Sequence, residues 1–377
     1  MAIEDWSRQA LPAMLDDIRT LVELETPSHD RPALARGLTA VRELTAERLG
    51  PPDGETRHDG GRYGDVLELR YAGTAPDEVL LLGHYDTVWP AGTLAGWPFA
   101  IEDGTMTGPG VFDMKAGLVQ AIWAVRGLRA LGLPHPGVRF LFNGDEEIGS
   151  PASRPRVEAA CADAVATLVF EPSLRGALKT SRKGVGVFDV TVTGVEAHAG
   201  LDPAAGASAV HALAELVTRL AAAGAPERGT TVNVGLISGG TGRNVAAGLA
   251  TCGVDVRVGD PAEMARIDEL FAGLRAADPR VTVSVAGEWN RPPMTPNPPS
   301  RRLFKEARAV AAAQGWELAE AAVGGASDGN FVSALGRAVL DGFGAVGDGA
   351  HARHEHVLVG HVPERTALTI GLISALA

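Results

Sequence analysis

Short apolar runs that end in ionisable residues are the feature that most constrains the fold of this chain. Residues 79–82 predict a buried strand, and His84 and Asp86 follow it closely. Two later runs, 137–143 and 164–170, repeat the pattern and lead into acidic residues. Helical segments alternate with these runs, which favours an α/β fold. Because ligand sites in such folds gather at the carboxyl ends of the strands, we expect these side chains to converge on one point.

Carboxylates crowd the ends of the two later runs. Glu146 and Glu147 belong to the triplet 145–147 after the first of them, and Glu171 directly follows the second. Neighbouring carboxylates at the end of a buried strand are costly to bring together unless cations or protons neutralise them. In a solvated loop the same residues would cost little. The triplet by itself therefore leaves two interpretations open, a cation site and a solvated acidic turn.

A glycine-rich turn at residues 107–117 precedes a predicted helix at 118–131. The turn has the general form of a dinucleotide-binding loop. However, Asp113 occupies the place of the third glycine in G-x-G-x-x-G, and its carboxylate would repel a pyrophosphate. A nucleotide-dependent oxidoreductase is therefore disfavoured.

Composition excludes several other classes of protein. The chain has 377 residues, a formal net charge of −12 and a pI near 5.3, and it contains no run rich in Lys or Arg. These values argue against nucleic acid and anionic membranes as partners. Cys161 and Cys252 lie far apart in apolar stretches and fit no zinc or redox spacing. No stretch resembles a secretory leader or a membrane span, so we expect a cytoplasmic protein.

The pattern of elements changes at about residue 182. A strand, a helix, two strands, a helix and a strand follow in that order, which is the ferredoxin-like split β-α-β unit. These elements are predicted at 186–193, 203–222, 230–237, 250–258, 261–275 and 281–286. The proline-rich stretch 291–299 then forms a stiff connection. We predict a discontinuous first domain, 1–181 and 293–377, with a central mixed sheet flanked by helices, and an inserted second domain, 182–292.

The stretch 347–356 adds three histidines, of which His351 is the best ligand candidate because it follows a glycine-rich turn. The chain then offers two histidines and three acids for metal, namely His84, His351, Asp113, Glu147 and Glu171. Nitrogen and carboxylate ligands without thiolates suit Zn²⁺, with Co²⁺ or Mn²⁺ as alternatives. The set is sufficient for a bridged pair of ions if Asp113 spans them. Glu146 remains as a general base, which predicts a hydrolytic site.

Six motifs together resemble one known family. They are His84-x-Asp86 and the stretches 108–115, 145–150, 170–173, 197–200 and 349–351. The set resembles the dizinc metallopeptidases typified by bacterial glutamate carboxypeptidase, whose relatives include acetylornithine deacetylase, succinyl-diaminopimelate desuccinylase and aminoacylases. The likeness covers nearly the whole chain, with the motifs in the same order.

The resemblance implies a role for each candidate ligand. One zinc ion would be held by His84 and Glu171, the other by Glu147 and His351, and Asp113 would bridge both. It also implies that the peptide bond after Asp113 is cis, as is often found in the family. The first domain would then be the catalytic dizinc domain, and the inserted domain would serve for dimerisation and closure.

Two further acidic residues have implied roles in catalysis. Asp86 would orient His84, and Glu146 would take a proton from the water that bridges the metals and pass it to the leaving amine. His198 would reach from the partner subunit to stabilise the oxyanion, which implies a homodimer. Substrate contacts would come from Asn244, Arg257, Arg291 and Gly325.

The substrate expected from the resemblance is a small acyl or peptidyl amino acid, from which a C-terminal amino acid is released. The arginine fork of Arg257 suits the carboxylate of such a substrate. Glutamate specificity is less well supported, because Ala177 stands where the family member has a substrate-contacting lysine. An N-acyl-amino-acid deacylase acting on a small acyl group is an alternative, and a non-catalytic dimeric binding protein is a second.

Overall fold

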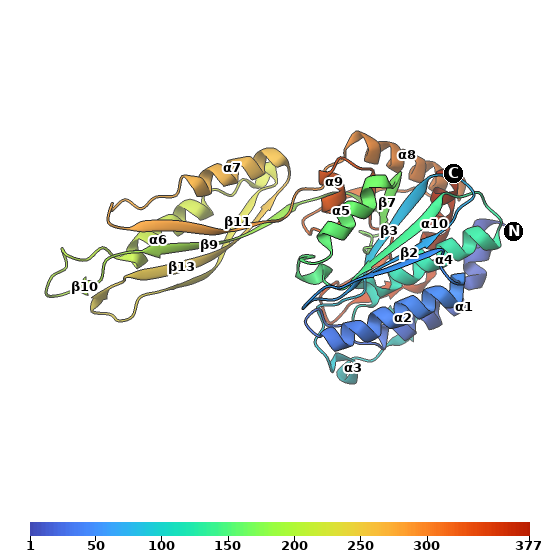
Figure 1. Ribbon diagram of the computed structural model, residues 1–377, viewed down its shortest axis with the longest axis horizontal. Helices are drawn as coiled ribbons and strands as arrows, with labels where there is room; N and C mark the ends of the chain where they lie inside the picture. The colour runs from blue at the N-terminus through green and yellow to red at the C-terminus, as the bar shows by residue number, and fades with distance from the viewer. The chain divides into compact units, whose positions relative to one another are not determined.

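The computed structural model describes residues 1–377, which form two compact units (Figure 1). Unit 1 comprises Met1–Ser181, Pro296–Val323 and Ser327–Ala377, and unit 2 comprises Arg182–Thr295 with the short loop Gly324–Ala326. Unit 2 thus extends to Thr295 rather than to residue 292, and it includes a loop from the C-terminal part of the chain that the sequence analysis placed in the first domain.

An eight-stranded mixed sheet forms the centre of unit 1. In spatial order it consists of β1 (Gly54–His58), β2 (Val66–Tyr71), β6 (Gly137–Asn143), β3 (Glu78–His84), β7 (Ala166–Val169), β16 (Val339–Asp341), β8 (Leu178–Arg182) and β15 (Glu320–Val323). The strand β3 runs parallel to both of its neighbours, β6 and β7, and β16 runs parallel to β7. Strands β1 and β2 pair antiparallel at one side. The α/β fold with a central mixed sheet is therefore confirmed.

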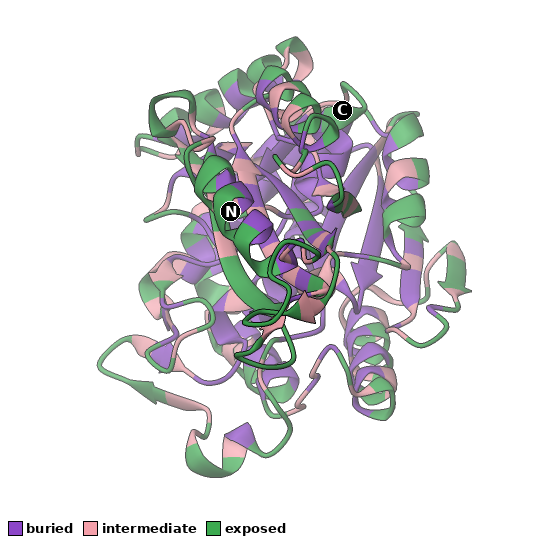
Figure 2. Ribbon diagram, turned by 90° about the vertical axis from the view of Figure 1, so that its left-hand side faces the viewer, coloured by how far each residue is buried: buried purple, intermediate pink, exposed green.

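Helices cover this sheet and complete the core. They are α1 (Ile3–Val22), α2 (Arg31–Leu49), α3 (Thr93–Gly96), α4 (Ala116–Ala130), α5 (Arg154–Asp163), α8 (Pro298–Ala313), α9 (Gly329–Ala334) and α10 (Val362–Ala375). Helix α4 is predominantly apolar, is buried over most of its length and packs against α1, α2 and α10. Figure 2 shows buried residues along the strands of this central sheet, whereas the outer faces of the surrounding helices carry exposed positions. None of the helices combines the length and the apolar character that crossing a bilayer requires.

A second, small antiparallel sheet in unit 1 joins two distant parts of the sequence. Its strands, in order, are β17 (Gly347–Asp348), β18 (His356–Leu358), β5 (Thr105–Thr107) and β4 (Ala100–Glu102). The register places Val357 opposite Met106. The segment that contains His351 therefore lies beside the strand that leads into the glycine-rich turn.

Unit 2 has the ferredoxin-like order of elements. Its main sheet is β11 (Thr231–Gly239), β13 (Leu249–Val258), β9 (Gly184–Thr193) and β14 (Thr282–Arg291), all antiparallel, with α6 (Ala209–Ala221) and α7 (Pro261–Ala272) as the helices. A two-stranded ladder, β10 (Ala197–His198) with β12 (Val245–Ala246), extends from it. The predicted helix start at residue 203 is wrong. Helix α6 begins at Ala209, because the Ser208 side chain caps it by accepting a hydrogen bond from the backbone N–H of His211.

Candidate metal centre

Three strand ends bring the first group of predicted site residues together. His84 is the last residue of β3, and the acidic triplet and Glu171 follow the flanking strands β6 and β7. His84 pairs in register with Asn143, the last residue of β6. Since the three strands are parallel neighbours, their carboxyl ends lie side by side. The convergence predicted from the apolar runs is therefore present.

The glycine-rich turn delivers Asp113 to the same place. Gly110 has a φ of +74°, and a Cβ atom there would lie 2.5 Å from Cγ2 of Thr87, so the position requires glycine. The turn continues into a short π-helical segment, η1 (Val111–Lys115), and then into α4. The peptide bond between Asp113 and Met114 is cis, as the resemblance implies.

The two carboxylate oxygens of Asp113 face two different histidines. Oδ1 lies 3.2 Å from Nε2 of His84, and Oδ2 lies 3.4 Å from Nε2 of His351. Each histidine has a second acidic neighbour: Glu171 Oε1 lies 3.4 Å from His84 Nε2, and Glu147 Oε2 lies 3.1 Å from His351 Nε2. One carboxylate thus stands between two histidine and glutamate pairs.

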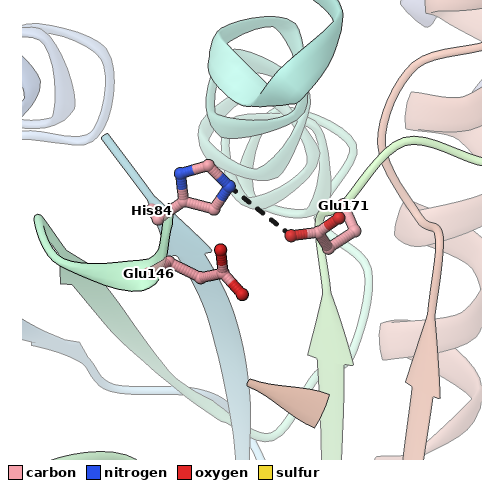
Figure 3. A group of neighbouring side chains, drawn as sticks. All are labelled: His84, Glu146 and Glu171. Atoms are coloured by element: carbon pink, nitrogen blue, oxygen red, sulfur yellow. Dashed lines mark ion pairs between the residues drawn. The ribbon is translucent and has the colours of Figure 1, made fainter. Parts of the chain in front are cut away.

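Glu146 completes the cluster on the His84 side. A ligand atom of Glu146 lies within 4.8 Å of the corresponding atoms of His84 and Glu171, and Figure 3 shows its carboxylate directed into the space between them. Ligand atoms of His84, Asp113 and Glu147 likewise lie within 4.8 Å of one another. By geometry alone, Glu146 is a candidate ligand as well as a candidate base.

Asp86 contacts His84 and the acidic turn on the side away from the other ligand candidates of His84. Its side chain is fully buried, with Oδ1 3.4 Å from Nδ1 of His84, and it accepts hydrogen bonds from the backbone N–H groups of Glu146 and Glu147. The hydroxyl of Ser28 also donates to it, at 2.8 Å. The backbone carbonyl oxygen of Asp86 lies closer to Nδ1 of His84, at 3.0 Å. Asp86 therefore contacts the histidine through its backbone and its side chain, and its carboxylate also holds the acidic turn.

The charges and hydrogen bonds of this cluster fit a divalent cation. A neutral His84 that donates through Nδ1 toward Asp86 directs the lone pair of Nε2 at two carboxylates, which is repulsive unless a cation or proton lies between them. Oε1 of Glu147 is buried without a hydrogen-bond partner. Nitrogen and carboxylate donors without sulfur suit Zn²⁺, Co²⁺ or Mn²⁺.

The pKa values of the clustered histidines and Glu147 are shifted where several carboxylates lie close together. Burial, followed by the negative charge of Asp113, raises the pKa of Glu147 to about 7. Hydrogen bonds with Asp113 and Glu147 raise the pKa of His351 to about 11. Although burial alone would lower it, contacts with Asp113 and Asp86 hold the pKa of His84 well above its ordinary value. Positive charge is therefore strongly favoured at this point.

An open depression of about 520 Å³ adjoins the cluster within unit 1. Glu147 forms part of its wall, and apolar contributions come from Pro27, Val88 and Ile148. A molecule bound in this depression would lie next to a candidate metal ligand.

The predicted site residues of unit 2 lie in three places. His198 lies on β10 opposite Val245, and the backbone carbonyl of the preceding Asn244 accepts a hydrogen bond from the N–H of Ala199. Arg257 and Arg291 lie on β13 and β14, and both are in register with Val185 of the strand between them. Gly325 belongs to the loop Gly324–Ala326, where its carbonyl accepts a hydrogen bond from Arg182.

Sequence reasoning missed two residues that contact this centre. Ser28 supports Asp86, and Glu355 accepts hydrogen bonds from the backbone around Asp113. In the sequence, Ser28 is only a serine before a predicted helix and Glu355 only an acid near three histidines, so neither pattern indicates a role in a metal site. Asp348, His354 and His356, which lie in the same segment as Glu355, make no side-chain contact with the cluster that would assign them a role there.

Comparison with known proteins decides the family. Residues 80–375 match the profile described as peptidase family M20/M25/M40. The chain belongs to this family of hydrolases. It is 29% identical over 380 residues to carboxypeptidase G2 from Pseudomonas sp., which covers 97% of this chain and 89% of that protein. It is 32% identical over 342 residues to succinyl-diaminopimelate desuccinylase from Maricaulis maris, which covers 81% and 83% of the two chains.

Solved structures of M20 peptidases and their relatives share the fold. Aminopeptidase PepT from Bacillus cereus aligns with a TM-score of 0.80 at 21% identity, covering 97% of this chain and 98% of that one. A dinuclear metal binding peptidase of the M20 family from Bacillus subtilis aligns with a TM-score of 0.73 at 15% identity, covering 98% and 99%. The resemblance deduced from the six motifs is thereby confirmed at the level of family and fold.

Proposed function

We propose that this M20 protein is a two-metal hydrolase that cleaves an amide or peptide bond and releases an amino acid with a free carboxylate. The observation that carries the proposal is the position of Asp113, whose two oxygens each face a separate histidine and glutamate pair. This arrangement suits a carboxylate that bridges two ions. The similar dinuclear metal binding peptidase from Bacillus subtilis supports two ions per chain.

Five side chains would hold the two metals. They are His84 and Glu171 on one side, Glu147 and His351 on the other, and Asp113 between them. Bound there, two Zn²⁺ ions, or Co²⁺ or Mn²⁺ in their place, would polarise the scissile carbonyl and lower the pKa of a water molecule.

Glu146 acts as the general base rather than as a ligand. The two metal positions are already provided with carboxylates from Asp113, Glu147 and Glu171, and Glu146 lies beside His84 and Glu171 (Figure 3). From there its carboxylate accepts a proton from the attacking water and returns it to the leaving amine. The proton carried by Glu146 balances the step, because the water supplies OH to the carbonyl carbon and H to the nitrogen.

His198 supplies the hydrogen-bond donor for the developing oxyanion. Its Nδ1 accepts hydrogen bonds from the backbone N–H groups of Gly200 and Leu201, at 3.1 Å each. The proton of the neutral ring is therefore on Nε2, which makes Nε2–H a donor. A donor fixed in this way suits oxyanion stabilisation.

We propose that His198 acts in a homodimer, as the resemblance implies. The edge strand β11 of unit 2 exposes Leu236 to 75% and Ile237 to 66%. An exposed apolar edge strand is a natural site for pairing with a second copy of the chain.

Arginines in unit 2 select a substrate with a carboxylate. Arg257 and Arg291 flank the same residue of β9, and Arg257 forms a two-pronged contact with Asp255, at 2.9 and 3.0 Å. This contact fixes the orientation of the guanidinium and engages Nε and Nη2, so a substrate carboxylate would be bound by the other edge, which includes Nη1. The similarity to carboxypeptidase G2 supports release of a C-terminal amino acid. The 32% identity to a desuccinylase favours removal of a small acyl group as the second candidate.

Hydrolysis of matched substrate pairs tests the proposal. Each pair consists of an N-acyl or peptidyl amino acid and the same compound with its C-terminal carboxylate converted to an amide. We expect chelator-sensitive release of the amino acid from the free acid and little from the amide. Cleavage that survives metal removal would contradict the two-metal hydrolase, and equal cleavage of both members would contradict carboxylate recognition.

Acyl groups of graded size separate the two candidate functions. A panel from acetyl and succinyl to large peptidyl groups on one amino acid would be measured with the same metal-loaded sample. Activity confined to the small acyl groups would favour the deacylase, whereas activity on the large groups would favour the carboxypeptidase.

A further inference from the structure

Glu355 is a buried carboxylate whose hydrogen bonds are directed at the turn that carries Asp113. Its side chain is fully buried, four residues after His351. Oε1 accepts hydrogen bonds from the backbone N–H groups of Phe112 and Asp113, at 2.9 and 3.0 Å. Oε2 accepts from the backbone N–H of Gly110 and from Nε1–H of Trp89, at 3.1 and 2.9 Å. Four N–H groups thus converge on one charge, and one of them belongs to Asp113 itself.

The same residue closes the loop that carries His351. Its backbone N–H donates to the carbonyl of Ala352, and the N–H of Ala352 donates to the carbonyl of Gly349. Gly349 has a φ of +84°, and a Cβ atom there would lie 2.8 Å from the nitrogen of Glu355. The loop is therefore tightly folded against Glu355, directly before strand β18.

Trp89 provides a second attachment between the two segments. Its ring packs edge-on against Trp97, with centroids 5.0 Å apart, and the guanidinium of Arg353 lies 5.2 Å from its centroid. The ring is thus held by two neighbouring side chains, and its Nε1–H donates to Glu355.

We propose that Glu355 is a positioning residue of the metal centre, which holds the backbone of Asp113 and the loop of His351 in the one arrangement that lets both side chains reach a shared ion. This inference rests on the proposed two-metal function. Its main effect falls on the position formed by Asp113, Glu147 and His351, because the His84 side has its own support in Asp86. The neighbouring turn and loop meet through Glu355 although they lie 242 residues apart.

Glutamine cannot replace Glu355 without loss. Both oxygens of Glu355 face two N–H donors each. The amide of a glutamine offers one acceptor and one donor, so its NH₂ group would be directed at two N–H groups. The Glu355→Gln variant keeps the volume of the side chain and removes both the charge and half of the accepting capacity.

Titration of the metal-free full-length protein with Co²⁺ tests the proposal, by calorimetry and by visible absorption. The wild type is expected to bind two ions per chain. We expect the half with the buried His84 to fill first and the half with the half-exposed His351 to fill second. In Glu355→Gln the first ion should bind with little change, and the second should bind about 10- to 100-fold more weakly, the effect usual for partners that orient metal ligands. Trp89→Phe, which removes one donor, should shift the second ion in the same direction by less, and it serves as the test if Glu355→Gln does not fold.

Glu263→Gln is the matched control. Glu263 is also a fully buried carboxylate with several donors, including Thr230 and Arg266, but it lies in unit 2. This variant should lower the melting temperature and leave both binding events unchanged. A structural role for Glu355 would likewise lower the melting temperature without a selective change in the second ion.

The outcomes separate the inference from the proposed function. Wild-type protein that binds one ion or none would overturn the two-metal function and this inference with it. Two ions in the wild type, with unchanged or equally weakened binding of both ions in Glu355→Gln and Trp89→Phe, would overturn the inference alone. Selective weakening of the second ion in either variant supports it.

Discussion

The two histidines of the candidate metal centre are held in different ways. His84 ends a central strand, has 2% of its side chain exposed and contacts a buried carboxylate. His351 lies in a loop with a φ of +62° and has 52% of its side chain exposed. The His84 half is therefore positioned by the sheet, whereas the His351 half depends on loop contacts such as those of Glu355. A two-metal site can thus combine one rigid half with one that is assembled by distant residues.

The largest effect is expected from substitution of the adjacent residues Glu146 and Glu147, which should differ in whether metal is retained. Glu146→Gln should lower kcat by about 10²- to 10⁴-fold, the usual contribution of a general base, while both metals are retained. Glu147→Gln should in addition release metal from the His351 half, since it removes a ligand of that half. Steady-state kinetics with metal analysis on the same samples would check both. Loss of metal from Glu146→Gln would mean that Glu146 is a ligand.

Asp86→Asn should affect the His84 half more than the His351 half, which it reaches only through the backbone N–H of Glu147. The asparagine cannot offer two negatively charged oxygens to His84 and to the N–H groups of the acidic turn. We expect metal affinity to fall by about 10- to 100-fold for the first ion to bind. Calorimetric titration of the metal-free variant measures this change. A change confined to the second ion would reverse the assignment of the two halves.

Removal of metal by a chelator should occur in two phases. The ion beside the half-exposed His351 should leave roughly tenfold faster than the ion beside His84, at the lower end of the effect of supporting contacts on metal sites. Loss of Co²⁺ absorption after addition of a chelator would be followed over time. A single phase, in which both ions leave together, would contradict the claim that the two halves hold their ions differently.

Ser28→Ala should have the smallest effect. It removes one hydrogen bond to the Asp86 carboxylate, and a bond to a charged group contributes about 1.5–3 kcal/mol. Because the backbone N–H groups of Glu146 and Glu147 still hold Asp86, only part of this free energy reaches the metal, and we expect a loss of affinity of less than about tenfold. Titration of the first metal ion would show a shift of that size. The exposed serine Ser284, on β14 of unit 2, offers a control, because Ser284→Ala should leave metal binding unchanged.

Local sequence signals explain why much of the fold is predictable, together with the part of the site that lies at the strand ends. Each apolar run such as 137–143 contains its own strand signal, and parallel pairing brings the ends of neighbouring strands together. The start of α6 is not predictable from apolar spacing, because the cap at Ser208 decides it. The support of Asp113 by Glu355 is not predictable either, since three of the four donors are backbone N–H groups that carry no sequence signature.

The number of metal ions per chain tests the central claim most directly. Native mass spectrometry of the purified full-length protein, after addition of Zn²⁺ and removal of excess metal, would report the ions bound to each chain. The account predicts two Zn²⁺ ions on the wild type and loss of firmly bound metal in Asp113→Ala, because that residue faces both halves. A wild-type chain that holds one ion or none would contradict it.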